Sequence, residues 1–132
     1  MTRMLAFVND TLEPYTTKAR ECVAGARSEL ANARYNNAAN RAYYAAYNAA
    51  IVALIRAGIT DSRWTHDQVQ AMFAGQLIGR RKLYPRDMRR MLSDLAVIRT
   101  RADYCREVVS RAIAEDAVRK AREFQRRVAG VQ

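Results

Sequence analysis

Apolar residues recur every three or four positions along most of the chain, which is the pattern of α-helices that bury one face. The spacing predicts helices over residues 17–33, 35–57, 65–78, 85–104 and 111–128, and residues 4–12 could form a short lead-in turn or helix. Alternating strand patterns and sequence repeats are absent. Because the connections are short, we expect an all-α fold, a four- to five-helix up-and-down bundle.

The predicted helix over residues 35–57 is rich in alanine, whose small side chain allows neighbouring helices to approach closely. We therefore expect this helix to be the central one of the bundle. Tyr43, Tyr44 and Tyr47 lie between the alanines, and their hydroxyls need polar partners when buried.

Residues that commonly begin or end helices lie at the predicted boundaries. They are Thr16 or Thr17 after Pro14, Gly58, Thr65 with Gln68 in the capping-box position, Gly79, Pro85 and Ser110. Residues 59–64 are expected to form a loop. The 132 residues fit a single domain, 1–132, with a core over about 17–128.

No apolar run is long enough to cross a membrane, and the N-terminus has no apolar run typical of a secretory signal. The sequence therefore predicts a cytoplasmic protein that does not enter a membrane. Cys22 and Cys105 stand apart from each other, and His66 is the only histidine, so we expect neither a metal nor a cofactor. In a reducing compartment, both thiols would be small buried apolar groups rather than a disulfide.

The charge balance indicates a polyanionic partner. Lysine and arginine together number 23 against 13 aspartates and glutamates, which gives a net charge of +10. Only Lys18, Lys82 and Lys120 are lysines. Arginine pairs with phosphate in a bidentate manner and stacks on bases, which favours RNA or a nucleotide as the partner. The alternative is that the charge serves solubility alone.

Familiar catalytic patterns are missing. The sequence has no Gly-rich phosphate loop, and a single histidine leaves only one possible base for a nucleophilic triad. His66 follows the predicted cap at Thr65, where we interpret it as a surface residue at a helix start.

Two polar segments interrupt predicted apolar faces: residues 40–45, Asn-Arg-Ala-Tyr-Tyr-Ala, and residues 99–104, Arg-Thr-Arg-Ala-Asp-Tyr. Arg41 lies in a stretch expected to be largely buried, so its charge must be paired or line a cleft. Arg99 and Asp103 have the four-residue spacing at which helical side chains pair. One hypothesis is a network from Arg41 to Asp103 that ties two helices together; the other is an electropositive cleft that holds phosphate.

With these two segments, and with Thr65-His66 and Phe73 between them, the chain resembles the HEPN superfamily over about residues 18–128. It is most similar to the small stand-alone prokaryotic members. The resemblance implies a helical bundle that dimerises and, in many members, a metal-independent ribonuclease of toxin–antitoxin, phage-defence or CRISPR systems. A minimal nucleotidyltransferase that acts as the antitoxin is a partner that the resemblance makes plausible.

The ribonuclease motif of that superfamily is an arginine followed a few residues later by a histidine, with two copies meeting across the dimer. Matched onto this chain, the arginine is Arg99, and Tyr104 stands where the histidine would be. A tyrosine titrates near 10, which makes it a poor general base at neutral pH. The resemblance thus supports a dimer cleft for RNA or nucleotide better than it supports catalysis.

Three hypotheses follow. In the first, a homodimer binds RNA or nucleotide in a basic cleft, where Arg41, Arg99 and Arg101 contact phosphate, Asp103 orients an arginine, and Tyr44 and Tyr104 stack or form hydrogen bonds. In the second, the protein is a metal-independent endoribonuclease with Arg99 and Tyr104 in the motif positions. In the third, the polar cluster only staples the bundle, whose surface docks a nucleotidyltransferase or another protein.

Overall fold

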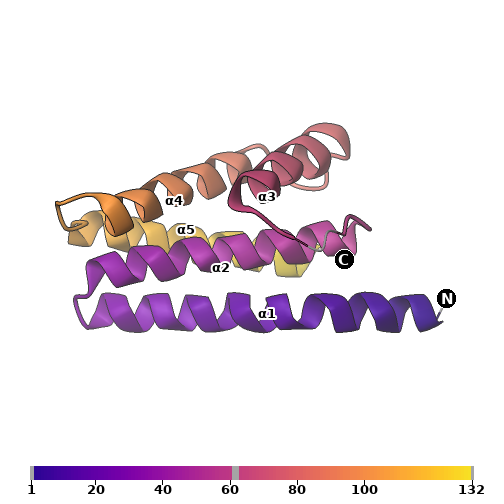
Figure 1. The fold of residues 1–132 in the computed structure, drawn as a ribbon, viewed down its shortest axis with the longest axis horizontal. Helices are drawn as coiled ribbons and strands as arrows, with labels where there is room; N and C mark the ends of the chain where they lie inside the picture. Colours follow the sequence, from indigo (N-terminus) through magenta and orange to yellow (C-terminus); the bar gives the residue numbers. More distant parts are fainter. Residues whose placement is uncertain (1, 61–62, 132) are drawn as a thin grey trace.

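A computed structural model describes residues 2–60 and 63–131, and these residues form helices and no strand. The helices are α1 (Thr2–Ala31), α2 (Tyr35–Arg56), α3 (His66–Met72), the π-helix η1 (Phe73–Arg80), α4 (Asp87–Tyr104) and α5 (Arg111–Gly130). Successive long helices run in opposite directions, so that the described chain is an up-and-down bundle (Figure 1). The expected all-α fold is confirmed.

Helix α2 is the centre of the bundle, as its alanine content predicted. It packs against α1, α4 and α5 and also contacts α3 and η1. Its alanines at positions 38, 39, 42, 45, 46, 49, 50 and 53 are all buried, which lets helices approach it from several sides. Figure 1 shows α1 on one side of α2, and α4 with α3 on the other.

Helix α1 begins much earlier than the predicted start at residue 17. It runs from Thr2 straight through Pro14, whose ring is exposed at the surface. Leu12 is buried, and Val8 and Tyr15 pack against the core. Their burial stabilises the helix and offsets the loss of the backbone hydrogen bond that Pro14 cannot donate.

The other end of α1 comes two residues before the predicted position 33. Ala33 adopts a left-handed backbone with φ of 59°, which no helix continues. The backbone N–H of Arg34 then donates to the carbonyl of Glu29 at 2.9 Å, closing the turn into α2. Helix α2 ends one residue before the predicted 57, and Gly58 follows with φ of 83°, as expected for a glycine after a helix.

The third predicted helix is two segments in the structure. The Thr65 side chain caps α3 by accepting from the backbone N–H of Gln68 at 3.2 Å, which confirms the predicted start. From Phe73 the chain widens into η1, so Gly79 lies within the helical segment instead of closing it. A Cβ on Gly79 would lie 3.3 Å from the carbonyl oxygen of Ala74, five residues earlier. Of the predicted loop over 59–64, residues 61 and 62 lie outside the described residues.

The last two helices agree closely with the prediction. Helix α4 begins at Asp87, two residues after Pro85, and ends at Tyr104 as expected. The Ser110 side chain caps α5 by accepting from the N–H of Ile113 at 3.2 Å, and α5 continues two residues beyond the predicted 128.

Both cysteines are free thiols, but only one fits the expected burial. Cys22 is half-buried, and burial raises the pKa of its thiol. Cys105 is exposed, so the expectation of a buried thiol is wrong there: it follows the last residue of α4, beyond the packed part of that helix. Among the described helices, none combines the length and apolar character needed to cross a membrane.

Candidate functional site

Four polar residues connect the start of α2 with the end of α4. The Asn40 side-chain amide donates from Nδ2 to both carboxylate oxygens of Asp103, at 3.0 and 3.2 Å. Its Oδ1 accepts from Nε and Nη2 of Arg41, at 3.1 and 2.6 Å. Arg99 reaches the same Asp103 carboxylate at 3.5 Å. We call Asn40, Arg41, Arg99 and Asp103 the α2–α4 polar cluster.

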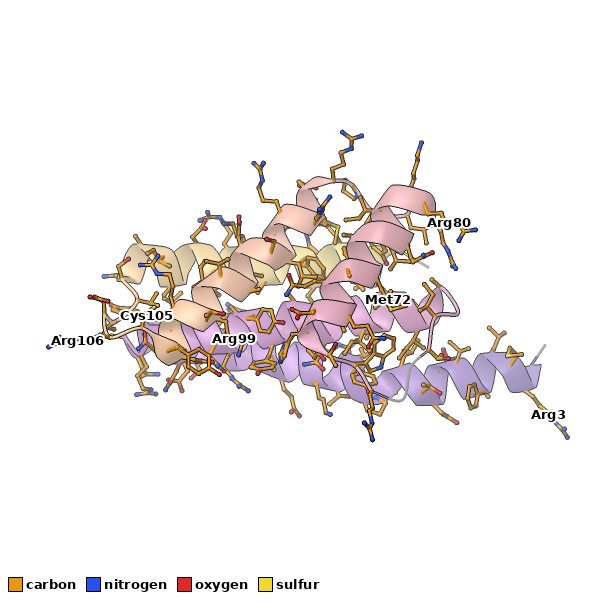
Figure 2. All side chains as sticks on the ribbon, turned by 45° about the horizontal axis from the view of Figure 1, so that its top comes forward. Arg3, Met72, Arg80, Arg99, Cys105 and Arg106 are labelled. Atoms are coloured by element: carbon orange, nitrogen blue, oxygen red, sulfur yellow. The ribbon has the colours of Figure 1, made fainter. Side chains whose placement is uncertain are left out.

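Arg99 lies deeper than Arg41, the other cation of this cluster. Its side chain is 17% exposed, whereas Arg41 is exposed. The guanidinium carbon lies 5.1 Å from the centre of the Tyr43 ring, a cation–π distance. Its Nε is buried and has no hydrogen-bond acceptor among the described residues. Arg99 therefore has donor capacity beyond its single long contact with Asp103. In Figure 2 it lies on α4 not far from the Cys105 end.

Aromatic side chains surround the inner side of the cluster. Tyr43, Tyr44 and Tyr47 of α2 and His66 of α3 form ring contacts with centroid separations between 4.8 and 6.1 Å. The Tyr43 hydroxyl lies 2.6 Å from Nδ1 of His66, and the Tyr47 hydroxyl donates to the carbonyl of Trp64 at 3.0 Å. These two hydrogen bonds hold the start of α3 against α2.

The same surroundings determine the protonation of two rings. Burial raises the pKa of Tyr43 to about 12, so its hydroxyl keeps its proton and can donate it to Nδ1 of His66. Burial, and then the positive charge of Arg99, lower the pKa of His66 from its ordinary 6.5. Near neutral pH, His66 is therefore an uncharged imidazole that shares its environment with Arg99.

The predicted site residues do not all meet. Arg41, Arg99 and Asp103 belong to the α2–α4 polar cluster, and Tyr44 lies beneath Arg41, with 5.1 Å from the guanidinium carbon to the ring centre. The expected burial of Arg41 is wrong, because its side chain is exposed. Asn40, rather than Arg41, forms the hydrogen bonds to Asp103.

Arg101 and Tyr104 lie elsewhere, on the solvent side of α4. Both are exposed, and the ring of Tyr104 is 77% exposed. Five residues along a helix turn a side chain by roughly 140°, so Arg99 and Tyr104 project from different sides of α4. Within one copy of the chain, the two motif positions therefore do not face a common point.

Sequence reasoning missed the roles of Tyr43 and His66. His66 looked like a surface residue at a helix start, whereas it is half-buried against three tyrosines. The three tyrosines in one predicted helix signalled buried hydroxyls that need partners, but nothing in the spacing identified the partner. That partner comes from a helix separated from α2 by a loop.

Arg41, Arg99 and Asp103 together carry a formal charge of +1, and Arg101 adds one positive charge on the solvent side of α4. Arg41 and Arg99 can donate several N–H groups to an anion, with Tyr44 as the aromatic surface beside Arg41. Nowhere in the described ranges do three His, Cys, Asp or Glu side chains gather as metal ligands would.

Most of the chain matches a known protein family. Residues 12–131, nearly the whole chain, match the HEPN domain family. No curated protein matches the chain. The match begins at Leu12, within α1 and ten residues after that helix starts.

Proposed function

Because this chain belongs to the HEPN family, we propose that it binds RNA or a nucleotide through the α2–α4 polar cluster and the neighbouring Arg101 and Tyr104. A second copy of the chain completes the basic cleft. The family is often ribonuclease- or toxin-related, and we place this protein in a toxin–antitoxin or defence system on that ground. A nucleotidyltransferase is the corresponding partner.

The observation that carries the proposal is that Arg99 makes fewer hydrogen bonds than its guanidinium can donate. Its guanidinium lies against Tyr43 and makes only a 3.5 Å contact with Asp103, while 17% of the side chain stays exposed. A phosphate oxygen is the acceptor that suits a guanidinium best. Asp103, fixed by Asn40, orients the arginine without fully neutralising the exposed arginines around it.

The homodimer in this proposal follows from where α4 points its side chains. Arg99 faces α2, whereas Arg101 and Tyr104 face solvent. A nucleotide bound at Arg99 does not lie on Tyr104 of the same copy, which leaves Tyr104 of a second copy to complete the cleft. Exposed Val108, at 70%, lies just beyond the same end of α4 and supplies apolar surface for such a contact.

The exposed arginines allow a test that does not disturb folding. We expect Arg41→Ala and Arg101→Ala each to weaken binding of a single-stranded RNA by several-fold, measured by fluorescence anisotropy, and to make the salt dependence shallower by about one unit of slope. The matched controls are Arg20→Ala and Arg27→Ala, exposed arginines of α1. Equal losses in all four variants, or no RNA binding by the wild type, would contradict the proposal.

Metal-independent RNA cleavage is a second candidate, favoured by one observation: an uncharged His66 lies in the electrostatic reach of Arg99. In such a reaction a base removes the proton of a ribose 2′-hydroxyl, the oxygen attacks the adjacent phosphate, and the 5′-oxygen leaves with a proton. A cyclic phosphate and a 5′-hydroxyl result. Arg99 would stabilise the phosphate charge, with Tyr104 or His66 handling the proton.

Incubation with total RNA in EDTA decides this second candidate. Cleavage that is lost in Arg99→Ala supports it, and parallel reactions of Tyr104→Phe and His66→Ala identify the group that moves the proton. If the RNA stays intact with every protein but shows a mobility shift, the protein binds RNA without cleaving it. Intact RNA without any shift favours the third reading, in which the α2–α4 polar cluster staples the bundle and its surface docks another protein.

A further inference from the structure

The outer face of α4 has a row of arginines that the α2–α4 polar cluster does not use. Residues separated by three, four or seven positions share one face of a helix. Arg86, Arg90, Arg101 and Tyr104 have these separations, with Ser93 and Val97 between them, and all six are exposed. We call Arg86, Arg90 and Arg101 the outer arginine row.

The acidic residues of α4 are turned away from this row and are already paired. Asp87 accepts from Arg127 of α5 at 2.8 Å, and Asp94 from Lys120 of α5 at 3.3 Å. Asp103 is held by Asn40 and Arg99. In contrast, no member of the outer arginine row forms an ion pair with any residue that the structure describes.

The row continues into the turn that precedes α4. Arg80, Lys82 and Arg89 are also exposed and form no ion pair within residues 2–60 and 63–131. A hollow of about 880 Å³ between η1 and α4 has Lys82, Arg86 and Arg89 on its wall. Figure 2 shows nitrogen-tipped side chains that project from this end of the molecule, where Arg80 is labelled, while Arg99 and Arg106 lie toward the other end.

The outer face of α4 thus has arginines near both of its ends, with the uncharged Ser93 and Val97 between them. From Arg90 to Arg101 the helix rises by roughly 16 Å, and from Arg86 to Tyr104 by roughly 27 Å. That length corresponds to about ten base pairs of the A-form duplex that RNA adopts, whose rise is roughly 2.8 Å per base pair. Ser93 and Val97 offer a flexible strand neither charge nor an aromatic surface. A stiff duplex, by contrast, would hold its phosphates against the arginines at both ends of this face at once.

From this layout, and resting on the proposed RNA binding, we propose that the preferred RNA is a stem-loop. Its base-paired stem lies along the outer arginine row, and its unpaired nucleotides reach Tyr104 and the α2–α4 polar cluster. Stem recognition here is by shape and phosphate contacts, without base readout. A second copy of the chain fits the Arg86–Arg90 end of this face poorly, because two such ends would oppose arginine to arginine; the dimer contact of the proposed function lies at the other end of α4.

The test compares two RNA probes and two double variants. The probes are a hairpin with a stem of about ten base pairs and an unstructured single strand of the loop sequence. The first variant is Arg86→Glu/Arg90→Glu, which removes two of the three arginines of the row at the start of α4, where glutamate is compatible with the helix dipole. The second, Arg20→Glu/Arg27→Glu, changes the net charge equally on α1, a helix that does not contact α4.

We expect Arg86→Glu/Arg90→Glu to weaken hairpin binding by about tenfold or more and to make its salt slope shallower by about two, while single-strand binding changes little. The α1 control should bind the hairpin within about threefold of the wild type. Melting curves and size-exclusion profiles verify fold and oligomeric state.

Other outcomes separate this inference from the function on which it rests. If the single strand binds with dependence on Arg101, but hairpin affinity is unchanged in Arg86→Glu/Arg90→Glu or falls equally in both variants, the stem contact is wrong and the function stands. A change of oligomeric state in Arg86→Glu/Arg90→Glu would make the row an interface between copies and overturn the inference. If the wild type binds neither probe, both proposals fall.

Discussion

At the scale of single residues, His66 shows how a small change of surroundings alters a side chain's chemistry. The imidazole has Tyr47 at 4.8 Å between ring centroids, accepts from the Tyr43 hydroxyl, and feels the charge of Arg99. Burial among these rings, and then the charge of Arg99, lower the pKa of the imidazole and favour its uncharged form. The sequence presented His66 only as a residue after a cap, because helical periodicity does not say which tyrosines of another helix a side chain will meet.

The lowered pKa of His66 makes stability depend on pH. Since the folded-state pKa lies below the ordinary 6.5, the folded protein resists protonation of this ring. The stabilising contribution is fully present above pH 6.5 and is lost as the pH falls through that value toward the folded-state pKa. We expect the wild type to lose more thermal stability between about pH 7.5 and about pH 5 than His66→Gln, which cannot titrate there.

Thermal melts of both proteins across this range provide the measurement. The difference in melting temperature between them should shrink or reverse on acidification. Parallel pH profiles for the two proteins would contradict the assigned environment of His66.

Asn40 is the residue on which the α2–α4 polar cluster depends. Its amide accepts from Arg41 and donates to Asp103, so each polar atom has a partner from a charged side chain. Asn40→Ala leaves the Asp103 carboxylate with only the long Arg99 contact, and we expect a loss of about 1–2 kcal/mol in the free energy of unfolding. Asn37→Ala, one turn earlier on α2, removes only an exposed 3.4 Å hydrogen bond to Glu29 and should cost much less.

Chemical denaturation of the two alanine variants measures this difference. Equal losses in both would mean that the α2–α4 polar cluster contributes no more than surface hydrogen bonds do. The sequence could place Asn40 beside Arg41, but not the contact of Asn40 with Asp103, which is 63 residues away.

At the scale of helices, local signals predicted most boundaries, and the two main failures have different causes. Thr65, Ser110 and Gly58 act where the sequence placed them, because caps and left-handed glycines depend on neighbouring residues alone. The start of α1 was wrong because buried Leu12 stabilises a helix through Pro14. The widening at Phe73 was missed because a π-helix has no distinct apolar period over so few residues.

Two glycines of η1 allow a test of its wide turns. A Cβ on Gly75 would meet nothing within 4 Å, whereas one on Gly79 would press on the carbonyl oxygen of Ala74 at 3.3 Å. We expect Gly75→Ala to raise stability by up to about 1 kcal/mol, as alanine does in exposed helical positions, and Gly79→Ala to gain less or to destabilise. Melting temperatures of both variants decide this; equal gains would contradict the π-helical geometry.

At the scale of the whole molecule, net charge and fold together define a polarised surface. The acidic side chains of α4 pair with residues of α5 and α2, and the arginines of its outer face are exposed to solvent. The sequence could predict a basic all-α bundle with α2 at its centre, since composition and periodicity report these directly. It could not predict which cations would remain unpaired, because that depends on how the faces of different helices pair.

The central claim is that RNA binds at the α2–α4 polar cluster and the adjoining end of α4. The most direct test is an NMR titration of the ¹⁵N-labelled chain with a single-stranded RNA. We predict the largest shift changes at the Asn40 side-chain amide, at Nε of Arg99, and at the backbone amides of Arg101 and Tyr104. Changes that gather instead on the exposed face of α1 around Arg20 and Arg27, or spectra that do not respond to RNA, would contradict it.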